Sequence, residues 1–280
     1  MNKPDTAVIA QALQHQGWSE VELHLFCELP STSAWLWQHA QIPADESKVN
    51  SHPVLCATDW QTAGSGRRGK TWQSNVGNIT FSLMTEIPHA PAKLMGLSLV
   101  TGIAIAEHLR SATGITVELK WPNDILFGGA KLGGLLTELK VISQPASPGS
   151  SASTLQSATR IVTGIGLNLL HSDALSNLGI GGTSLERAGA QFVERDVMIG
   201  GLAVSVLEAH ERFHTQGWAV FEDAWRRYDC LAGKMVSVIN SNDVEQVMAV
   251  GVGENGALMV RKGKRTYPVY SGDVSIRPVG

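Results

Sequence analysis

The sequence predicts an α+β protein in which a large domain of mixed strands and helices is followed by a small β-barrel. One observation is a long, largely apolar helix at Ala92–Leu109, whose composition indicates burial in a core. Another is the series of short strand-like segments on either side of that helix. After Cys230 the sequence pattern changes to short, closely spaced strand-like segments with Gly-containing turns. We therefore expect domains at residues 1–231 and 232–280.

The elements of the large domain follow from hydrophobic spacing and from the residues at their ends. Pro4 precedes the first helix and Gly17 follows it, and a Ser/Thr start precedes the second helix. The predicted helices are Thr6–His15, Ser31–Gln41, Ala92–Leu109, Val197–His214 and Trp218–Tyr228. The predicted strands are Glu22–Phe26, Val54–Thr58, Ile79–Met84, Val117–Lys120, Ile125–Phe127, Lys131–Val141 and Arg160–Leu169.

Turn residues separate the remaining elements. Gly128-Gly129 predicts a hairpin turn, and the Ser/Pro/Gly-rich stretch Ser143–Ser157 is interpreted as a mobile connection. The strands of the barrel are predicted at Lys234–Ile239, Val244–Val252, Ala257–Arg261 and Arg265–Val269.

Composition excludes several classes of protein. Hydrophobic residues make up 43% of the chain and charged residues 17%. The net charge is −3, so the chain lacks the large excess of basic residues that is typical of nucleic-acid-binding proteins. No signal peptide and no long uninterrupted apolar run is present, which argues against secretion and membrane spanning. Cys27, Cys56 and Cys230 are far apart and form no Cys-x-x-Cys pair, which argues against a disulfide framework or structural zinc. We expect a cytoplasmic protein with no nucleic-acid or membrane partner.

Two short motifs suggest chemistry that their surroundings do not support. Gly64–Gly69 matches the dinucleotide-binding pattern G-x-G-x-x-G, but Lys70–Asn75 behind it carries no helical pattern to face a pyrophosphate. His210–His214 matches the zinc motif H-E-x-x-H, yet no third ligand stands at a characteristic spacing. We interpret His210 and His214 as residues on the flank of a helix whose buried stripe includes Phe213.

Three other segments favour the binding of anions. Gln61–Lys70 carries the cations Arg67, Arg68 and Lys70 on a loop whose glycines let the backbone approach a ligand closely, although a solvated basic turn would have the same composition. Lys120-Trp121-Pro122-Asn123-Asp124 is a turn-forming motif ahead of a buried-looking strand, although a purely structural turn could look similar. Lys131 enters an apolar, glycine-bearing strand, where a lysine needs an anionic partner.

These motifs, in this order and spacing, resemble those of the biotin protein ligases, in particular the bacterial form without a DNA-binding domain. The resemblance runs from about Leu25 to Arg277. It implies a mixed sheet with flanking helices, like that of the class II aminoacyl-tRNA synthetases, followed by an SH3-like barrel. The most specific parts are Gly64–Lys70, Lys120–Asp124 and Lys131-Leu132-Gly133-Gly134.

The resemblance also implies site residues. Lys131 and Arg67 are the expected catalytic residues, and no metal ligand is expected. The expected biotin contacts are Ser31, Thr32, Ser33, Gln61, Ser65, Gly66, Arg67, Lys131 and Gly134. The expected ATP or adenylate contacts are Arg67, Arg68, Trp72, Asn123, Lys131 and Asn168.

The chain departs from the family pattern in three places. Ser65 stands where the family loop usually carries arginine, so one phosphate contact is missing, and Lys70 or a backbone N–H is expected to supply it. Ser33 replaces the usual asparagine and removes an amide from the expected head-group site. The Ser/Pro-rich insert at residues 143–157 has no counterpart in the family.

The activity that the resemblance implies has two steps. Biotin and Mg-ATP (ATP with Mg²⁺) give biotinyl-5′-AMP, and a lysine of the biotin carboxyl carrier protein of acetyl-CoA carboxylase, or of a similar carrier, then takes the biotinyl group. A lipoate ligase or octanoyltransferase is the nearest rival; an octanoyltransferase needs a nucleophilic cysteine, and none lies in these motifs. A biotin-responsive repressor would need an N-terminal winged helix, for which about 25 residues are too few.

Overall fold

The computed structural model of the chain describes residues 2–39, 52–144, 156–172, 175, 181–191, 193–240, 243–271 and 274–278. Its centre is a seven-stranded sheet in the order β1-β2-β5-β9-β8-β7-β6. Strands β1 and β2 run parallel, whereas every other neighbouring pair is antiparallel. The predicted mixed α+β fold is therefore confirmed.

Every strand predicted for the large domain is present in this sheet. The strands are β1 (Glu22–Leu29), β2 (Val54–Gln61), β5 (Ile79–Ile87), β6 (Glu118–Lys120), β7 (Asp124–Phe127), β8 (Ala130–Gln144) and β9 (Gln156–Leu167). Strands β8 and β9 pair as far as Gln144 and Gln156, so the predicted mobile connection at Ser143–Ser157 was too wide at both ends. Its middle, residues 145–155, lies outside the described residues.

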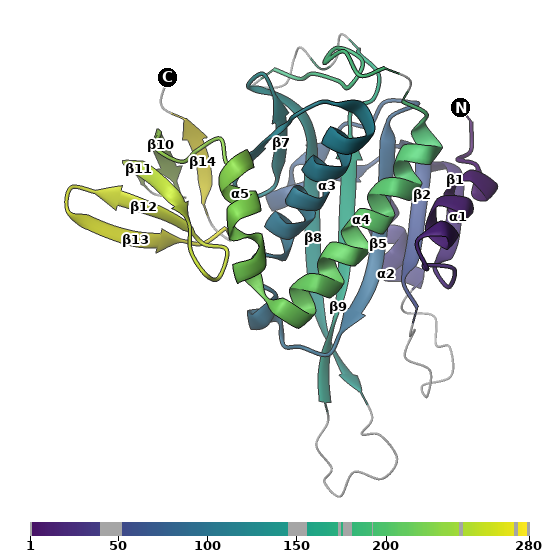
Figure 1. Cartoon of the computed structure of the whole chain (residues 1–280), viewed down its shortest axis with the longest axis horizontal. Helices are drawn as coiled ribbons and strands as arrows, with labels where there is room; N and C mark the ends of the chain where they lie inside the picture. The colour runs from purple at the N-terminus through teal and green to yellow at the C-terminus, as the bar shows by residue number, and fades with distance from the viewer. Residues whose placement is uncertain are drawn as a thin grey trace, which may run out of the picture.

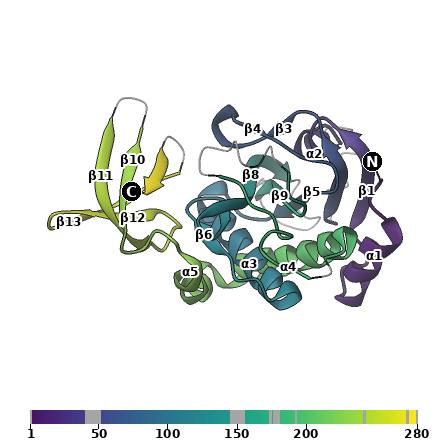
Figure 2. The ribbon, with the colours of Figure 1, turned by 90° about the horizontal axis from the view of Figure 1, so that it is seen from above.

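The helices cover both faces of the sheet. They are α1 (Thr6–His15), α2 (Thr32–His39), α3 (Leu97–Thr113), α4 (Arg195–Gln216) and α5 (Glu222–Tyr228), with 3₁₀ turns at Pro91–Leu94 and Trp218–Phe221. Figure 2 shows α3 and α4 on one side of the sheet and α2 with the β3–β4 hairpin on the other. The single helix predicted at Ala92–Leu109 is instead a 3₁₀ turn and an α-helix, separated at Gly96, whose φ of 96° is left-handed.

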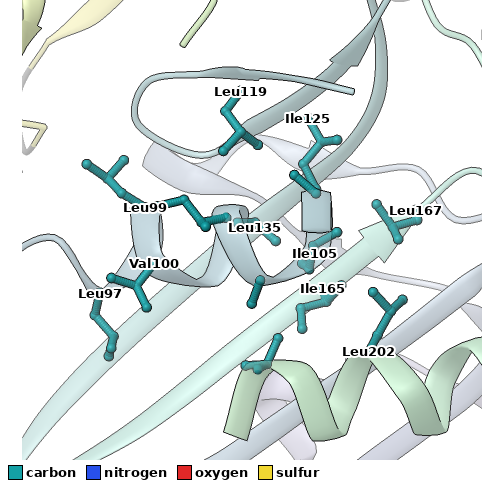
Figure 3. Packing of buried hydrophobic residues seen from close by; sticks show 14 of the residues in the cluster. Leu97, Leu99, Val100, Ile105, Leu119, Ile125, Leu135, Ile165, Leu167 and Leu202 are labelled. Atoms are coloured by element: carbon teal, nitrogen blue, oxygen red, sulfur yellow. The ribbon is translucent and has the colours of Figure 1, made fainter. Parts of the chain in front are cut away.

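Helix α3 is the central element of the core. It lies against the sheet beside α4 (Figure 1), and its leucine, isoleucine and valine side chains pack against strand residues such as Leu119, Leu135 and Ile165 (Figure 3). The helical stretch Pro91–Thr113 is long and apolar enough to cross a membrane by length and composition. Most of that stretch is buried inside this fold, as the sequence predicted for a core helix.

His210 corrects one prediction about the H-E-x-x-H helix. We expected both histidines on the flank, but His210 is 3% exposed and its Nε2 lies 2.9 Å from the Thr101 hydroxyl oxygen on α3. Burial lowers the pKa of His210 to about 4, so the ring is neutral near pH 7. His210 is therefore a core residue whose ring hydrogen-bonds to the Thr101 hydroxyl.

The C-terminal strands form a separate antiparallel sheet. Its strands are β10 (Met235–Ile239), β11 (Val244–Val252), β12 (Leu258–Lys262), β13 (Arg265–Val269) and β14 (Ser275–Pro278), in the order β13-β12-β11-β10-β14. Strand β14 was not predicted. Among the described residues β13 and β14 do not pair, so the sheet is open and a closed barrel is not confirmed. One hydrophobic core nevertheless runs through both parts, because Val236 and Leu258 belong to the same cluster as α3.

Candidate active site

The structure brings every residue predicted for the site to one cavity of about 580 Å³, a volume typical of small-molecule sites. The cavity lies on the α2 face of the sheet, and its walls come from α2, the β3–β4 hairpin, strands β5, β8 and β9, and the C-terminal segment. The predicted residues that line it are Ser31, Thr32, Ser33, Gln61, Ser65, Gly66, Arg67, Arg68, Trp72, Asn123, Lys131, Gly134 and Asn168. Their roles toward biotin or adenylate stay predictions.

The floor of this cavity is uncharged and polar. Gln61 Oε1 accepts hydrogen bonds from the Thr32 backbone N–H at 2.8 Å and from the Thr32 hydroxyl at 3.1 Å. The Ser82 hydroxyl lies 2.7 Å from that of Thr32 and 2.9 Å from that of Ser33. We call Thr32, Ser33, Gln61 and Ser82 the polar floor; all four are buried. Because the groups fix one another, their positions are set before a ligand arrives.

Two glycines of β9 leave room for their neighbours. A Cβ at Gly164 would lie 2.8 Å from the Ser33 hydroxyl oxygen, and one at Gly166 would lie 2.5 Å from the Trp72 indole ring. Real Cβ atoms do not come this close to a neighbour, so both positions need glycine for the present packing. Trp72 therefore lies directly against the backbone of β9 and forms one wall of the cavity.

The Gly-rich loop is built from short turns. It consists of β3 (Gly64–Ser65), a 3₁₀ turn at Arg67–Gly69 and β4 (Thr71–Trp72). Arg68 has a φ of 58°, a left-handed conformation that non-glycine residues seldom adopt. The loop continues into strand β4 and not into a helix. This agrees with our rejection of the dinucleotide-binding interpretation, which needs a helix after the loop.

Arg67 links the loop to two other parts of the chain. Its Nη1 donates to Asn123 Oδ1 at 3.4 Å, and its Nη2 donates to the backbone carbonyl of Ser271. Burial lowers the pKa of Arg67, while the charge of Asp124 raises it and that of Arg68 lowers it. The guanidinium stays charged, but its burial means that an anion placed beside it would be favourable.

Lys131 lies at the start of β8, near the loop residue Trp72. Its Nζ lies 2.5 Å from Asp124 Oδ1 and 5.6 Å from the centre of the Trp72 ring. The side chains of Lys131 and Asp124 are only 23% and 21% exposed. We call Arg67, Asp124 and Lys131 the charged rim. An ammonium has three donors, so Lys131 can bond a second anion while it keeps its bond to Asp124.

The side chain of Asn168 is buried and bonds to the protein backbone. Its side-chain Nδ2 donates to the backbone carbonyls of Thr183 at 3.0 Å and Lys131 at 3.5 Å, and the residue is 1% exposed. The amide therefore holds the backbone around Lys131, although the residue lines the cavity.

Three functional candidates were not predicted. Ser82 completes the polar floor, Asp124 pairs with Lys131, and Arg277 reaches the cavity from β14. Asp124 could have been found as the carboxylate inside Lys120–Asp124. Ser82 and Arg277 carry no local sequence signal, since their approach to the site depends on the folded sheet.

Comparison with known proteins agrees with this geometry. Residues 29–147 match the biotin/lipoate A/B protein ligase family. This stretch of the chain carries the domain of that family. The chain is 30% identical over 224 residues to the bifunctional ligase/repressor BirA of Escherichia coli, an alignment that covers 79% of this chain and 66% of BirA. It spans just under two thirds of that relative.

Other members align over most of their length. The chain is 28% identical over 264 residues to the biotin–acetyl-CoA-carboxylase ligase of Mycobacterium tuberculosis, which covers 92% of this chain and 89% of that protein. The fold is similar to that of the Aquifex aeolicus biotin protein ligase in complex with biotin and ATP, with a TM-score of 0.70 and 23% identity. That similarity covers 93% of this chain and 99% of the Aquifex chain and shows a shared fold.

Proposed function

We propose that this protein is an ATP-dependent biotin–protein ligase that forms biotinyl-5′-AMP and transfers the biotinyl group to a lysine of a biotin carboxyl carrier protein. The observation that carries the proposal is that one cavity is lined both by the buried polar floor and by the charged rim. An uncharged floor suits the ureido ring of biotin, which both donates and accepts hydrogen bonds. A cationic rim suits the carboxylate of biotin and the phosphates of ATP.

In the first step a biotin carboxylate oxygen attacks the α-phosphorus of ATP, and the bond to pyrophosphate breaks. Two anions must then be held together while negative charge grows on the phosphate. The Lys131 ammonium and the Arg67 guanidinium are the rim cations placed to stabilise that charge. Trp72, which packs against Gly166, shields the same space from water.

In the second step the neutral amine of the carrier lysine attacks the acyl carbon, the bond to AMP breaks, and the amine loses a proton. The mixed anhydride is already an activated acyl donor, so no nucleophile from the enzyme is required. Lys131 then stabilises the charge on the departing AMP phosphate.

ATP is expected to bring Mg²⁺, which neutralises charge on the departing pyrophosphate when it is bound. Sites of this kind hold the ion through phosphate and water oxygens and few protein carboxylates. Among the described residues that line the cavity, Asp124 is the one carboxylate, and it is already engaged by Lys131. The cavity therefore fits an ion carried by the triphosphate, with Asp124 as the available protein oxygen.

The cysteines argue against the octanoyltransferase alternative. Cys27, Cys56 and Cys230 are free thiols, and none of them is among the described residues that line the cavity. Burial raises the pKa of the Cys56 thiol, and burial with nearby carboxylates raises that of Cys230 to about 11. Neither thiol is activated as a nucleophile.

Biotin-dependent exchange of ATP with labelled pyrophosphate tests the proposal, with octanoate and lipoate as controls. We expect exchange with biotin and little with either control. Exchange driven by lipoate or octanoate at the biotin rate would overturn the proposal.

The free thiols accord with a location in the reducing cytoplasm. We propose domains at residues 1–231 and 232–280, the second of SH3-like kind.

A further inference from the structure

We propose that Glu22, His24 and His39 form a binding site for one Zn²⁺ ion on the surface of the large domain. Each residue offers one ligand atom, and these atoms all lie within 4.8 Å of one another. The site is separate from the cavity. His39 ends α2, whereas Thr32 of the polar floor begins it, so about 10 Å of helix lies between them.

The spacing of the ligand atoms is close to that of a metal-bound set. His24 Nε2 lies 2.6 Å from Glu22 Oε1, and His39 Nε2 lies 3.7 Å from the same oxygen. An ion with tetrahedral ligands about 2.1 Å away holds its ligand atoms about 3.4 Å apart. Small side-chain rotations are therefore enough to admit an ion between the three groups.

The fold holds the two imidazoles in place. Glu22 and His24 are two residues apart on β1, so both side chains point to the same face of the strand. The Trp35 ring stacks on His39 with centroids 4.9 Å apart and lies 4.5 Å from the His24 ring. The His24 and His39 rings are 4.8 Å apart. Positions fixed by packing reduce the entropy lost when an ion binds.

Ligand chemistry selects the metal. Two imidazoles and one carboxylate suit Zn²⁺, whereas Mg²⁺ and Ca²⁺ prefer sets made of oxygen. The side chains of His24 and His39 are 26% and 23% exposed and that of Glu22 is 50% exposed, so an ion can enter from solvent. Three protein ligands leave the fourth tetrahedral position to water.

The segments just before β1 and β2 provide a matched control. His52 Nδ1 lies 2.8 Å from Glu20 Oε2, which is a carboxylate–imidazole pair of the same kind. No second imidazole joins this pair among the groups found in the described residues. If Glu22, His24 and His39 only share a hydrogen bond, the two sites should behave alike toward zinc.

The experiment is a calorimetric titration of untagged protein with Zn²⁺ at neutral pH. The exposed thiol of Cys27 is first replaced by Cys27→Ser, because thiols also bind zinc. We expect one ion per chain, with affinity at least about tenfold weaker in His39→Ala and in His24→Ala and unchanged in His52→Ala. With Co²⁺ in place of zinc, the visible absorption of a tetrahedral centre should appear in the parent and vanish in His39→Ala.

Pyrophosphate exchange and thermal unfolding verify that each variant is folded, and His39→Gln replaces His39→Ala if the latter is not. Three outcomes would overturn the proposal. The parent could show no saturable zinc binding, His24→Ala and His39→Ala could bind zinc as the parent does, or His52→Ala could lose binding as they do. The result is independent of the ligase activity, since neither histidine lines the cavity.

Discussion

At the floor of the cavity Thr32, Ser33, Gln61 and Ser82 are uncharged and hydrogen-bond to one another, whereas at the rim Arg67, Asp124 and Lys131 are charged. The floor groups come from helix α2 and from strands β2 and β5 of the central sheet, which are regular elements. The rim groups come from a glycine-rich loop and from the two strands of a hairpin.

Under the proposed function, we expect this difference to separate selection of the ligand from its activation. A rigid, neutral floor binds the ligand equally well before and during reaction, so changes there should alter KM. The rim cations supply charge that is needed mainly when the phosphate is attacked, so changes there should alter kcat. The predictions below test this separation.

Lys131→Gln should produce the largest loss. The neutral amide cannot offset charge on the phosphate and carboxylate, so biotin-dependent pyrophosphate exchange should fall roughly 10²- to 10³-fold. Biotin binding without ATP, measured by calorimetry, should change little because the polar floor is intact. Lys131→Arg keeps the charge and should recover part of the exchange. Exchange near the wild-type rate in Lys131→Gln would show that the rim is not where activation occurs.

Arg67→Gly should release the intermediate. The change removes the contacts to Asn123 and Ser271 and adds flexibility to a loop that already holds Gly64 and Gly66. Adenylate should still form, because Lys131 remains, but its dissociation should be roughly tenfold faster or more. Incubation with biotin, ATP and albumin measures the leak as biotin on albumin lysines. Equal labelling by mutant and wild type, with exchange retained, would mean that Arg67 does not hold the adenylate.

Sequence reasoning found most of the elements and the two cations of the rim, because periodicity and glycine-rich motifs are local signals. It missed what depends on distant packing. Arg67 meets Ser271, a residue 204 positions away, and Ser82 bonds to Thr32, a residue 50 positions away. No local pattern records such pairs.

The errors in the predicted helices and strands, and in the predicted position of His210, have similar causes. Gly96, where the helix breaks, packs closely against Gly256 in the turn between β11 and β12, and the buried His210 bonds to the Thr101 hydroxyl of another helix. Strand β14 has four residues and ends in proline, so its pairing with β10 is visible only in the fold.

Gly166→Ala should disturb the wall of the cavity that Trp72 forms. Its methyl group would lie 2.5 Å from the Trp72 ring, so the indole must move into the cavity or away from β9. We expect KM for biotin to rise roughly tenfold, with the protein still folded. Gly102→Ala is the control, since its methyl group would meet Leu119 at an ordinary 3.4 Å. Unchanged kinetics in Gly166→Ala would mean that Trp72 is not a wall of the substrate site.

Ser82→Ala should have the smallest effect on activity and gives the sharpest test of the floor. The change removes one hydroxyl that bonds to both Thr32 and Ser33, so both side chains lose their fixed orientation. One or two neutral hydrogen bonds contribute about 1 kcal/mol, which predicts a KM for biotin raised roughly fivefold with kcat unchanged. Thr163→Val is the matched control. Its hydroxyl is buried on the neighbouring strand β9 and has no hydrogen-bond partner among the described residues, so its loss should leave KM unchanged and stability equal or higher. Steady-state exchange kinetics at varied biotin distinguishes the two variants. If Ser82→Ala lowers kcat with KM unchanged, the floor takes part in activation and the proposed separation from the rim is wrong.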